Sequence, residues 1–437
     1  MKKAALHNLG CKVNAYETEA MQQMLQQNGY EIVDFTDKAD VYIINTCTVT
    51  NIADRKSRQM LHKAKKMNPD AVVVATGCYA QASKEQVELD NCVDIIVGNN
   101  KKKDIVTILN EFESNKELEY VIDINHTAEY EELELESSLE HTRAIIKVQD
   151  GCNQFCSYCI IPFARGRVRS RQIDHVIKEV EKLAQKGFQE VVLTGIHLSS
   201  YGVDLEGEDL LSLIVAVNQV DGIKRIRLGS LEPRIITEKF AKTLSEMEKI
   251  CPHFHLSLQS GCDETLKRMN RRYSAEEYYE KCCLLRKYFD MPAITTDVIV
   301  GFPGETEEEF AVTKEYVKKV NFFEMHVFKY SKRQGTKAAA MENQVDEQIK
   351  GTRSEQLLTI TKEQSKEYLN KQIGRDLEVL IEEKTTIDGV EYYVGHSKEY
   401  IKCAVSSDEN LENKIVQCVG AERIGHNVIL AEMKNIK

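Results

Sequence analysis

The sequence predicts an α/β protein made of three consecutive domains. Over most of its length, short apolar runs alternate with segments of helical periodicity, a pattern typical of parallel sheets covered by helices. Near the carboxyl terminus this pattern gives way to short strands separated by turn-like residues, which favours an antiparallel barrel. A chain of 437 residues has room for three such units. We place an open parallel α/β domain at residues 1–140, a partial (βα)6 barrel at 141–370 and a small antiparallel β-barrel at 371–437.

The first domain begins with three short apolar runs of the kind that form buried parallel strands. These runs are Lys3–Asn8, Val41–Asn45 and Val72–Thr76, and the helical patterns between them are Glu17–Asn28 and Ala53–Met67. Further strands are expected at Val93–Val97 and Tyr120–Ile124. The carboxylates concentrated between residues 111 and 140 predict a surface edge and a linker to the next domain.

A cysteine follows each of the first three predicted strands: Cys11, Cys47 and Cys78. In an open parallel sheet, ligands bind beyond the carboxyl ends of the strands, so these thiols are expected to converge in space. For any single one of them the alternative is a small buried residue in a turn, because free cysteine is among the most buried residue types. Three such cysteines together favour a ligand set.

The second domain repeats a strand and a helix six times, which predicts a partial barrel with its reactive face at the carboxyl ends of the strands. The expected strands are Ala144–Val148, Glu190–Thr194, Lys224–Gly229, Phe254–Leu258, Ile294–Val300 and Glu324–Phe328. Helical patterns at Asp174–Lys186, Ala275–Phe289 and Thr306–Val320 lie between them.

Three more cysteines, Cys152, Cys156 and Cys159, are grouped in the loop that follows the first strand of this barrel. Cysteine thiolates bind zinc, copper(I) or iron–sulfur clusters. Structural zinc requires four protein ligands, and no second cysteine or histidine pair follows this loop at the usual spacing. We therefore expect the fourth ligand to come from outside the protein.

The third domain is expected to contain five strands, and small barrels of this kind often bind RNA. The strands are predicted at Leu377–Ile381, Val390–Val394, Tyr400–Val405, Ile415–Val419 and Asn427–Ala431.

The net charge of −11 argues at first sight against a nucleic-acid partner, but much of it comes from the acidic stretch at residues 111–140. Local basic groups bind phosphates whatever the net charge is. One such group is Arg165, Arg167, Arg169 and Arg171. The odd number of 13 cysteines and the lack of a long apolar run predict a soluble cytoplasmic protein without a membrane partner.

The loop from Cys152 to Cys159 resembles that of the radical S-adenosylmethionine (SAM) enzymes, in which SAM binds the open iron of a [4Fe–4S] cluster. The order of the three domains resembles the methylthiotransferase family: an auxiliary-cluster domain, a radical SAM barrel and an RNA-binding TRAM domain. Three stretches are most similar to the branch that acts on N6-threonylcarbamoyladenosine beside the tRNA anticodon: residues 9–19, 45–50 and 159–167. Sister branches modify isopentenyladenosine in tRNA or an aspartate of a ribosomal protein.

The resemblance implies two [4Fe–4S] clusters, one held by Cys152, Cys156 and Cys159 and one by the three strand-end cysteines of the first domain. The first cluster is expected to cleave SAM to a 5′-deoxyadenosyl radical, and the second to bind the sulfur that is methylated and transferred. An external electron donor and a sulfur source are needed as partners besides tRNA. The enzyme is expected to be a monomer, and no conventional general base is predicted.

Positions at or near the strand ends of the barrel are expected to contact SAM, although inward-facing barrel residues also serve packing. These positions are Tyr158, Thr194, Gly195, Ser230, Glu232, Gln259, Asp297 and Gly301. RNA contacts are expected at the four arginines named above and at Tyr400 and Lys402 of the third domain.

The leading hypothesis is a radical SAM methylthiotransferase that converts N6-threonylcarbamoyladenosine in tRNA to its 2-methylthio derivative. One alternative of a different class is a non-catalytic iron–sulfur RNA-binding protein that senses redox state, and another is a zinc protein. A barrel with an open iron favours the enzyme, since a sensor has no need of one.

Overall fold

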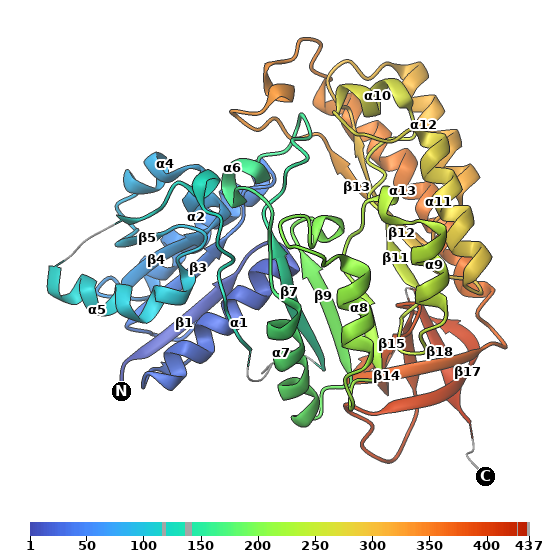
Figure 1. The fold of residues 1–437 in the computed structure, drawn as a ribbon, viewed down its shortest axis with the longest axis horizontal. Helices are drawn as coiled ribbons and strands as arrows, with labels where there is room; N and C mark the ends of the chain where they lie inside the picture. Colours follow the sequence, from blue (N-terminus) through green and yellow to red (C-terminus); the bar gives the residue numbers. More distant parts are fainter. Residues whose placement is uncertain (116–118, 136–141, 426, 435–437) are drawn as a thin grey trace.

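The computed structural model describes residues 1–115, 119–135, 142–425 and 427–434. In Figure 1 the amino-terminal sheet and its helices lie on one side of the molecule, the central strands in the middle and the carboxyl-terminal strands below them. Helices α9, α11 and α12 form an outer layer beside the central strands. The predicted α/β fold class is confirmed, with its parallel amino-terminal sheet, its central βα strands and its terminal β-barrel.

The amino-terminal sheet has six parallel strands in the order β2-β1-β3-β4-β5-β6. Its strands are β1 (Lys3–Asn8), β2 (Glu31–Ile32), β3 (Val41–Thr46), β4 (Val72–Gly77), β5 (Ile95–Val97) and β6 (Glu119–Tyr120). Its helices are α1 (Lys12–Gln27), α2 (Asn51–Met67), α3 (Cys78–Ala82), α4 (Lys84–Glu88) and α5 (Ile105–Asn115). Every residue of β3 is buried, as its continuous apolar character predicts for a central parallel strand. The predicted strand Tyr120–Ile124 is wrong over most of its length, because β6 ends at Tyr120 and Ile124 begins a 3-10 turn.

The central domain contains six parallel strands in two hydrogen-bonded groups, β10-β9-β7 and β11-β12-β13. The groups are joined by isolated parallel bridges between Ile226 and Ile250 and between Leu231 and Leu256. The strands are β7 (Arg143–Asp150), β9 (Glu190–Gly195), β10 (Arg225–Leu228), β11 (His253–His255), β12 (Ala293–Val300) and β13 (Glu324–Lys329). A short strand β8 (Arg169–Ser170), which was not predicted, pairs antiparallel with β7.

Helices cover the outside of these strands and enclose a large apolar core. They are α6 (Ile161–Arg165), α7 (Ile173–Gln185), α8 (Leu210–Asn218), α9 (Glu238–Ser245), α10 (Asp263–Arg268), α11 (Ala275–Tyr288) and α12 (Glu307–Val320). A further helix of 24 residues, α13 (Glu347–Asn370), connects two cores. Its Leu357 packs in the core of the central strands, whereas its Leu369 packs in the core of the terminal barrel.

The carboxyl-terminal strands close into a barrel in the order β14-β15-β16-β18-β17. They are β14 (Asp376–Ile387), β15 (Val390–Ser397), β16 (Lys402–Val405), β17 (Ile415–Ile424) and β18 (Val428–Met433). All neighbouring pairs are antiparallel except β16 and β18, which run parallel. Within the described ranges, no helix is both long and apolar enough to cross a bilayer.

Candidate cluster and cofactor site

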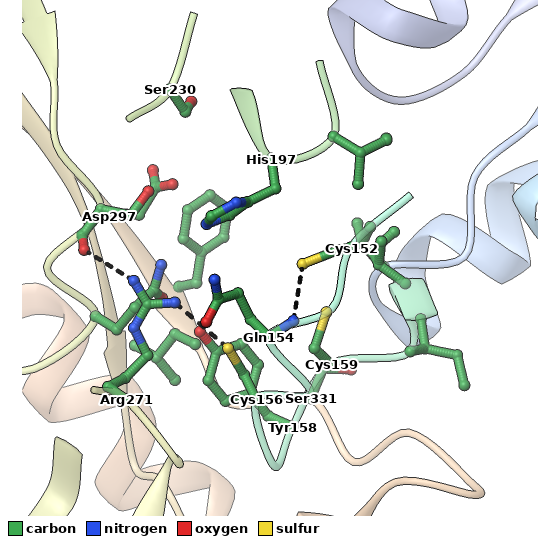
Figure 2. A pocket seen from close by; sticks show the side chains of 18 of the residues that line it. Cys152, Gln154, Cys156, Tyr158, Cys159, His197, Ser230, Arg271, Asp297 and Ser331 are labelled. Atoms are coloured by element: carbon green, nitrogen blue, oxygen red, sulfur yellow. Dashed lines mark hydrogen bonds between the residues drawn. The ribbon is translucent and has the colours of Figure 1, made fainter. Parts of the chain in front are cut away.

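A cavity of about 370 Å³ opens at the carboxyl ends of the central strands. Cys152, Cys156 and Cys159 all line it, as the position of their loop after the first barrel strand predicts. Figure 2 shows Cys152 and Cys159 on one side of this space, with Arg271 and Asp297 across from them. The loop therefore presents three thiols to the same cavity.

The backbone of the cysteine loop is held in place by neighbouring segments. Gly151, with φ +72°, makes the turn out of β7, and the amide of Cys152 then donates to the carbonyl of Gly166 at 3.0 Å. Ser157 donates from its amide to the carbonyl of Met269 at 3.0 Å and from its hydroxyl to that of Arg268 at 2.8 Å. These contacts fix the loop before any cofactor binds.

The thiols of this loop are suited to a positively charged ligand. Burial raises the pKa of Cys152 to about 11 and that of Cys159 to about 12, so both are neutral thiols at pH 7 unless a metal replaces the proton. Arg271 donates from Nη1 to Sγ of Cys156 at 3.3 Å. Three soft ligands with one cationic donor fit an iron–sulfur cluster.

Five of the eight positions predicted to contact SAM line the same cavity: Tyr158, Ser230, Glu232, Gln259 and Asp297. Gln259 has φ +69° and is held by backbone hydrogen bonds to β12, its amide donating to Asp297 at 2.8 Å. The other three predicted positions, Thr194, Gly195 and Gly301, do not belong to the cavity lining.

The two glycines outside the lining have structural roles of their own. A Cβ at Gly195 would lie 2.8 Å from Oε1 of Gln149, so the absence of a side chain allows β9 to pack against β7. The amide of Gly301 donates to the carboxylate of Glu305 at 2.6 Å. Contact of these two residues with SAM stays a prediction.

Several residues that line the cavity were not predicted as site residues, among them His197, Ser257 and Arg271. His197 directly follows Gly195–Ile196, and burial lowers its pKa to about 4, so that it is neutral at physiological pH. Its Nε2 lies 3.7 Å from a carboxylate oxygen of Glu232. The signal that could have found these residues is their position within a few residues of a strand end.

The second set of cysteines lies at the carboxyl edge of the amino-terminal sheet, where the strand order predicts it. Cys11 precedes α1, Cys47 follows β3 and Cys78 begins α3 directly after β4. A Cβ at Gly10 would lie only 3.1 Å from Sγ of Cys47, so the turn that carries Cys11 packs directly on Cys47. Cys47 and Cys78 are buried and Cys11 is exposed.

Residues of the two cysteine sites border one cavity. Val49 and Thr50, which follow Cys47 by two and three residues, line the same cavity as the cysteines of the barrel loop. Phe328 and Lys329, the last two residues of β13, line it as well. The cavity thus extends from the cysteine loop of the barrel to the segment that follows Cys47.

Three of the four arginines predicted to contact phosphates are fully buried: Arg165, Arg169 and Arg171. Arg165 and Arg169 pair with the buried Asp150, and Arg171 pairs with Glu179 and Glu132. A fully buried guanidinium that is paired with carboxylates cannot be reached by a phosphate at the surface, so the prediction is wrong at these three positions. Their partners come from other elements, Asp150 from β7 and Glu179 from α7, so the run of arginines alone made a solvated basic face the expectation.

The fourth arginine, Arg167, is exposed, and its guanidinium lies 4.6 Å from the ring centre of Phe155. Lys402 is exposed as well, at the start of β16. Tyr400 is half-buried, and its ring already stacks on His253 and His396, with centroid distances of 5.0 and 4.6 Å. The prediction that an RNA base stacks on Tyr400 is therefore corrected, because both histidines and Arg227 already occupy the space around its ring.

An α/β barrel whose first loop presents three cysteines to a cavity at the strand ends defines the radical SAM class of proteins. Two family models match the chain. "Radical SAM superfamily" matches residues 146–317, and "Uncharacterized protein family UPF0004" matches residues 3–98. The radical SAM methyltransferase TsrM from Kitasatospora setae has a TM-score of 0.56 and 17% identity, and it covers 75% of this chain and 72% of its own. At that identity the likeness shows a common fold.

Curated relatives show to which family of the radical SAM class the chain belongs. Threonylcarbamoyladenosine tRNA methylthiotransferase MtaB of Bacillus subtilis is 43% identical over 95% of this chain and 93% of its own length. The protein of the same name from Aquifex aeolicus is 42% identical over 88% and 94%. A tRNA-2-methylthio-N(6)-dimethylallyladenosine synthase from Alkaliphilus oremlandii is 34% identical over 95% and 89%. The chain belongs to the radical SAM methylthiotransferase family.

Proposed function

We propose that this protein is a radical SAM enzyme that attaches a methylthio group to C2 of N6-threonylcarbamoyladenosine next to the anticodon of tRNA. One observation carries the proposal: residues beside two separate three-cysteine sites border a single cavity. The substrate follows from relatives named for threonylcarbamoyladenosine that are 43% and 42% identical to this chain, whereas dimethylallyladenosine synthases are 34% to 36% identical.

Cys152, Cys156 and Cys159 would hold one [4Fe–4S] cluster, and Cys11, Cys47 and Cys78 a second. When bound, the first cluster and SAM supply radical chemistry that breaks an inert aromatic C–H bond, and the second carries the sulfur. The side chains of the protein itself would position the bound groups. Ser230, Glu232 and Asp297 present oxygen atoms to the cavity, where they bind the polar groups of SAM.

The cavity walls also separate the chemistry from water. Ile160, Ile161 and Ile299 line the space beside the cysteine loop with apolar side chains. His197 contributes a neutral imidazole, because burial lowers its pKa to about 4. The apolar part of the lining would exclude water and give the flat face of a substrate base a surface to pack against.

The RNA is proposed to bind outside the cavity through exposed basic residues, with Arg167 and Lys402 as contacts. Arg167 lies on the segment that follows the cysteine loop, and Lys402 lies on the terminal barrel. We assign the auxiliary cluster to a domain at residues 1–140, the radical chemistry to 141–370 and RNA binding by a TRAM domain to 371–437. An external electron donor and a sulfur source complete the cycle, and we propose a monomer that acts in the cytoplasm, where its tRNA substrate is found.

Two variants test whether the two cysteine sites have different roles in the reaction. Cys156→Ala is expected to abolish reductive cleavage of SAM and to retain a cluster in the amino-terminal domain. Cys47→Ala is expected to form 5′-deoxyadenosine but no methylthio product. Iron analysis of the anaerobic wild-type protein should give about eight irons per chain, as two cubane clusters require. Zinc in place of iron, or full methylthiolation by Cys47→Ala, would refute the proposal.

The main competitor is the same reaction on isopentenyladenosine, since relatives named for that nucleoside also match the whole chain. Mass spectrometry of tRNA nucleosides from cells that lack this protein decides between them. Loss of the 2-methylthio derivative of N6-threonylcarbamoyladenosine supports the proposal. Loss of the isopentenyl derivative instead contradicts it.

A further inference from the structure

Arg165 connects the two cysteine sites. It is the last residue of α6, a helix that begins two residues after Cys159, and its side chain is fully buried. From there the guanidinium reaches into the amino-terminal domain. Nε donates to Sγ of Cys78 at 3.2 Å, Nη2 donates to Oδ1 of Asn14 at 2.5 Å, and Nη1 donates to the carboxylate of Glu17 at 2.5 Å.

The surroundings of Arg165 hold more positive than negative charge. Four buried cations, Lys102, Lys147, Arg165 and Arg169, share two buried carboxylates, Glu17 and Asp150, in a single network of ion pairs. In the described part of the chain, these four cations form ion pairs with no other carboxylate. A buried excess of positive charge is costly unless an anion balances it. Arg165 already donates to one candidate ligand of this site, Sγ of Cys78, and a cluster bound at Cys11, Cys47 and Cys78 would supply the balancing negative charge.

A second contact ties the same helix to the same cysteine. Asn99 donates from Nδ2 to the carbonyl of Ala164 at 2.7 Å, and the same nitrogen lies 3.9 Å from Sγ of Cys78. Both the backbone of α6 and its last side chain are thus joined to Cys78. Any shift of the amino-terminal cysteine site relative to the barrel loop would break a buried, charge-assisted hydrogen bond.

We propose that Arg165 is a positioning residue that holds the amino-terminal cluster at a fixed place relative to the radical site and stabilises the reduced form of that cluster. The proposal rests on the assignment of a cluster to Cys11, Cys47 and Cys78. Reduction adds one negative charge to the cluster, so a neighbouring cation and an N–H donor to a ligand sulfur favour the reduced state. Without Arg165, the midpoint potential should become more negative and the cluster easier to lose.

Arg271 provides a matched control, because it donates to Sγ of Cys156 at 3.3 Å in the other cysteine site. Each site thus has one arginine that donates to one cysteine. If the inference is right, each arginine affects only its own cluster. If potentials respond merely to loss of any buried cation, substitution of either arginine would shift both.

The experiment is a redox titration followed by electron paramagnetic resonance. A Cys156→Ala background leaves the amino-terminal site as the one intact three-cysteine site, so the signal reports that cluster alone. In this background we compare Arg165→Lys with Arg165→Gln/Glu17→Gln, which removes one cation and one carboxylate and so keeps the net charge of the buried network unchanged. Both variants lose the N–H donor from Nε of Arg165 to Sγ of Cys78, so both are expected to shift the midpoint potential to more negative values. Removal of iron by a chelator should be several-fold faster.

The reciprocal arm uses a Cys47→Ala background, in which Arg271→Lys should shift the barrel cluster and Arg165→Lys should not. An unchanged potential and unchanged iron loss in both Arg165 variants would overturn the inference. None of these readouts involves tRNA, so the outcome is separate from that of the proposed function. If the wild-type chain fails to modify tRNA but the Arg165 shift is present, the function is wrong and the inference stands.

Discussion

Gly151 allows the chain to turn from β7 into the cysteine loop, and its lack of a side chain is essential there. A Cβ at this position would lie 1.8 Å from the carbonyl oxygen of Arg167, and the backbone has φ +72°. Gly151→Ala combines a steric clash with a strained backbone and is expected to cost more than ~3 kcal/mol of unfolding free energy. The measurement is urea denaturation of the anaerobic protein.

Gly187→Ala is the matched control for this prediction. Gly187 also has a positive φ of +91°, but no atom of the described residues lies within 4 Å of the position of its Cβ. It should cost only about 1 kcal/mol, from backbone strain alone. Equal costs for the two variants would mean that the close approach of Arg167 does not constrain the loop.

His197 predicts a dependence of stability on pH. Burial lowers its pKa to about 4 in the folded protein, whereas an unfolded chain has an ordinary value of about 6.5. Unfolding therefore takes up a proton between these values, so the contribution to stability is complete above pH 6.5 and is lost as the pH falls towards 4. Between pH 7 and 5 the wild type should lose about 2 kcal/mol more than His197→Asn. Parallel pH profiles of unfolding for the two proteins would contradict this assignment.

At the scale of single residues, the structure places the six predicted cysteines at or near strand ends, whereas it pairs three of the four predicted phosphate-binding arginines with carboxylates. The six cysteines were placed by their positions after strands, which depend on local periodicity. The arginines between residues 165 and 171 looked like a phosphate-binding face, but Asp150, Glu17 and Glu179 neutralise three of them. Asp150 lies on β7, Glu179 on α7 and Glu17 on α1, so the ion pairs form only when these elements pack together, and a local charge pattern does not reveal them.

Helix α11 owes part of its stability to a capping box at its start. The hydroxyl of Ser274 accepts from the amide of Glu277 at 3.1 Å, and the carboxylate of Glu277 accepts from the amide of Ser274 at 2.7 Å. Ser274→Ala should cost about 1 kcal/mol of unfolding free energy. Thr359→Ala, at an exposed interior position of α13, is the control and should be neutral or slightly stabilising. A cost below that of the control would exclude a capping role.

At the scale of elements, apolar runs identified every strand of the central barrel except β8, and the three predicted helices, α7, α11 and α12, begin and end within a residue or two of the expected positions, whereas α6, α8, α9 and α10 were not predicted. The strand β8 has two residues and depends on its pairing with β7, so it has no periodicity of its own. Helix α13 was not singled out, because its face is divided between two cores and its apolar residues do not form one stripe.

The contact between the central strands and the terminal barrel depends on Glu190, whose side chain is fully buried. Its carboxylate accepts from Nε of Arg227 at 2.8 Å, while Arg227 also donates to the backbone oxygens of Ser397 and Lys398. Glu190→Gln leaves buried guanidinium charge without its carboxylate and should destabilise the protein by about 3–5 kcal/mol. Hydrogen exchange should increase at β15 and β10.

The exposed pair of Glu238 and Lys287 gives the comparison for this prediction. Glu238→Gln should leave the free energy of unfolding close to that of the wild type and exchange at β15 unaffected, because water screens this exposed pair. If Glu190→Gln behaves in the same way, the buried network does not hold the barrel in place.

At the scale of the whole molecule, changes in periodicity along the sequence predicted the order and type of the three units. Their contacts, such as Arg227 with Ser397, arise from packing and could not be predicted.

The parallel pairing of β16 and β18 has a consequence for how the protein is made. β18 fits between β16 and β17, so a chain translated only as far as Ile424 has an open sheet with two bare edges. Such edges recruit strands from other molecules and promote aggregation. The nascent chain is therefore most vulnerable just before residues 428–433 leave the ribosome, and a premature stop in this short stretch should cause aggregation out of proportion to the few residues lost.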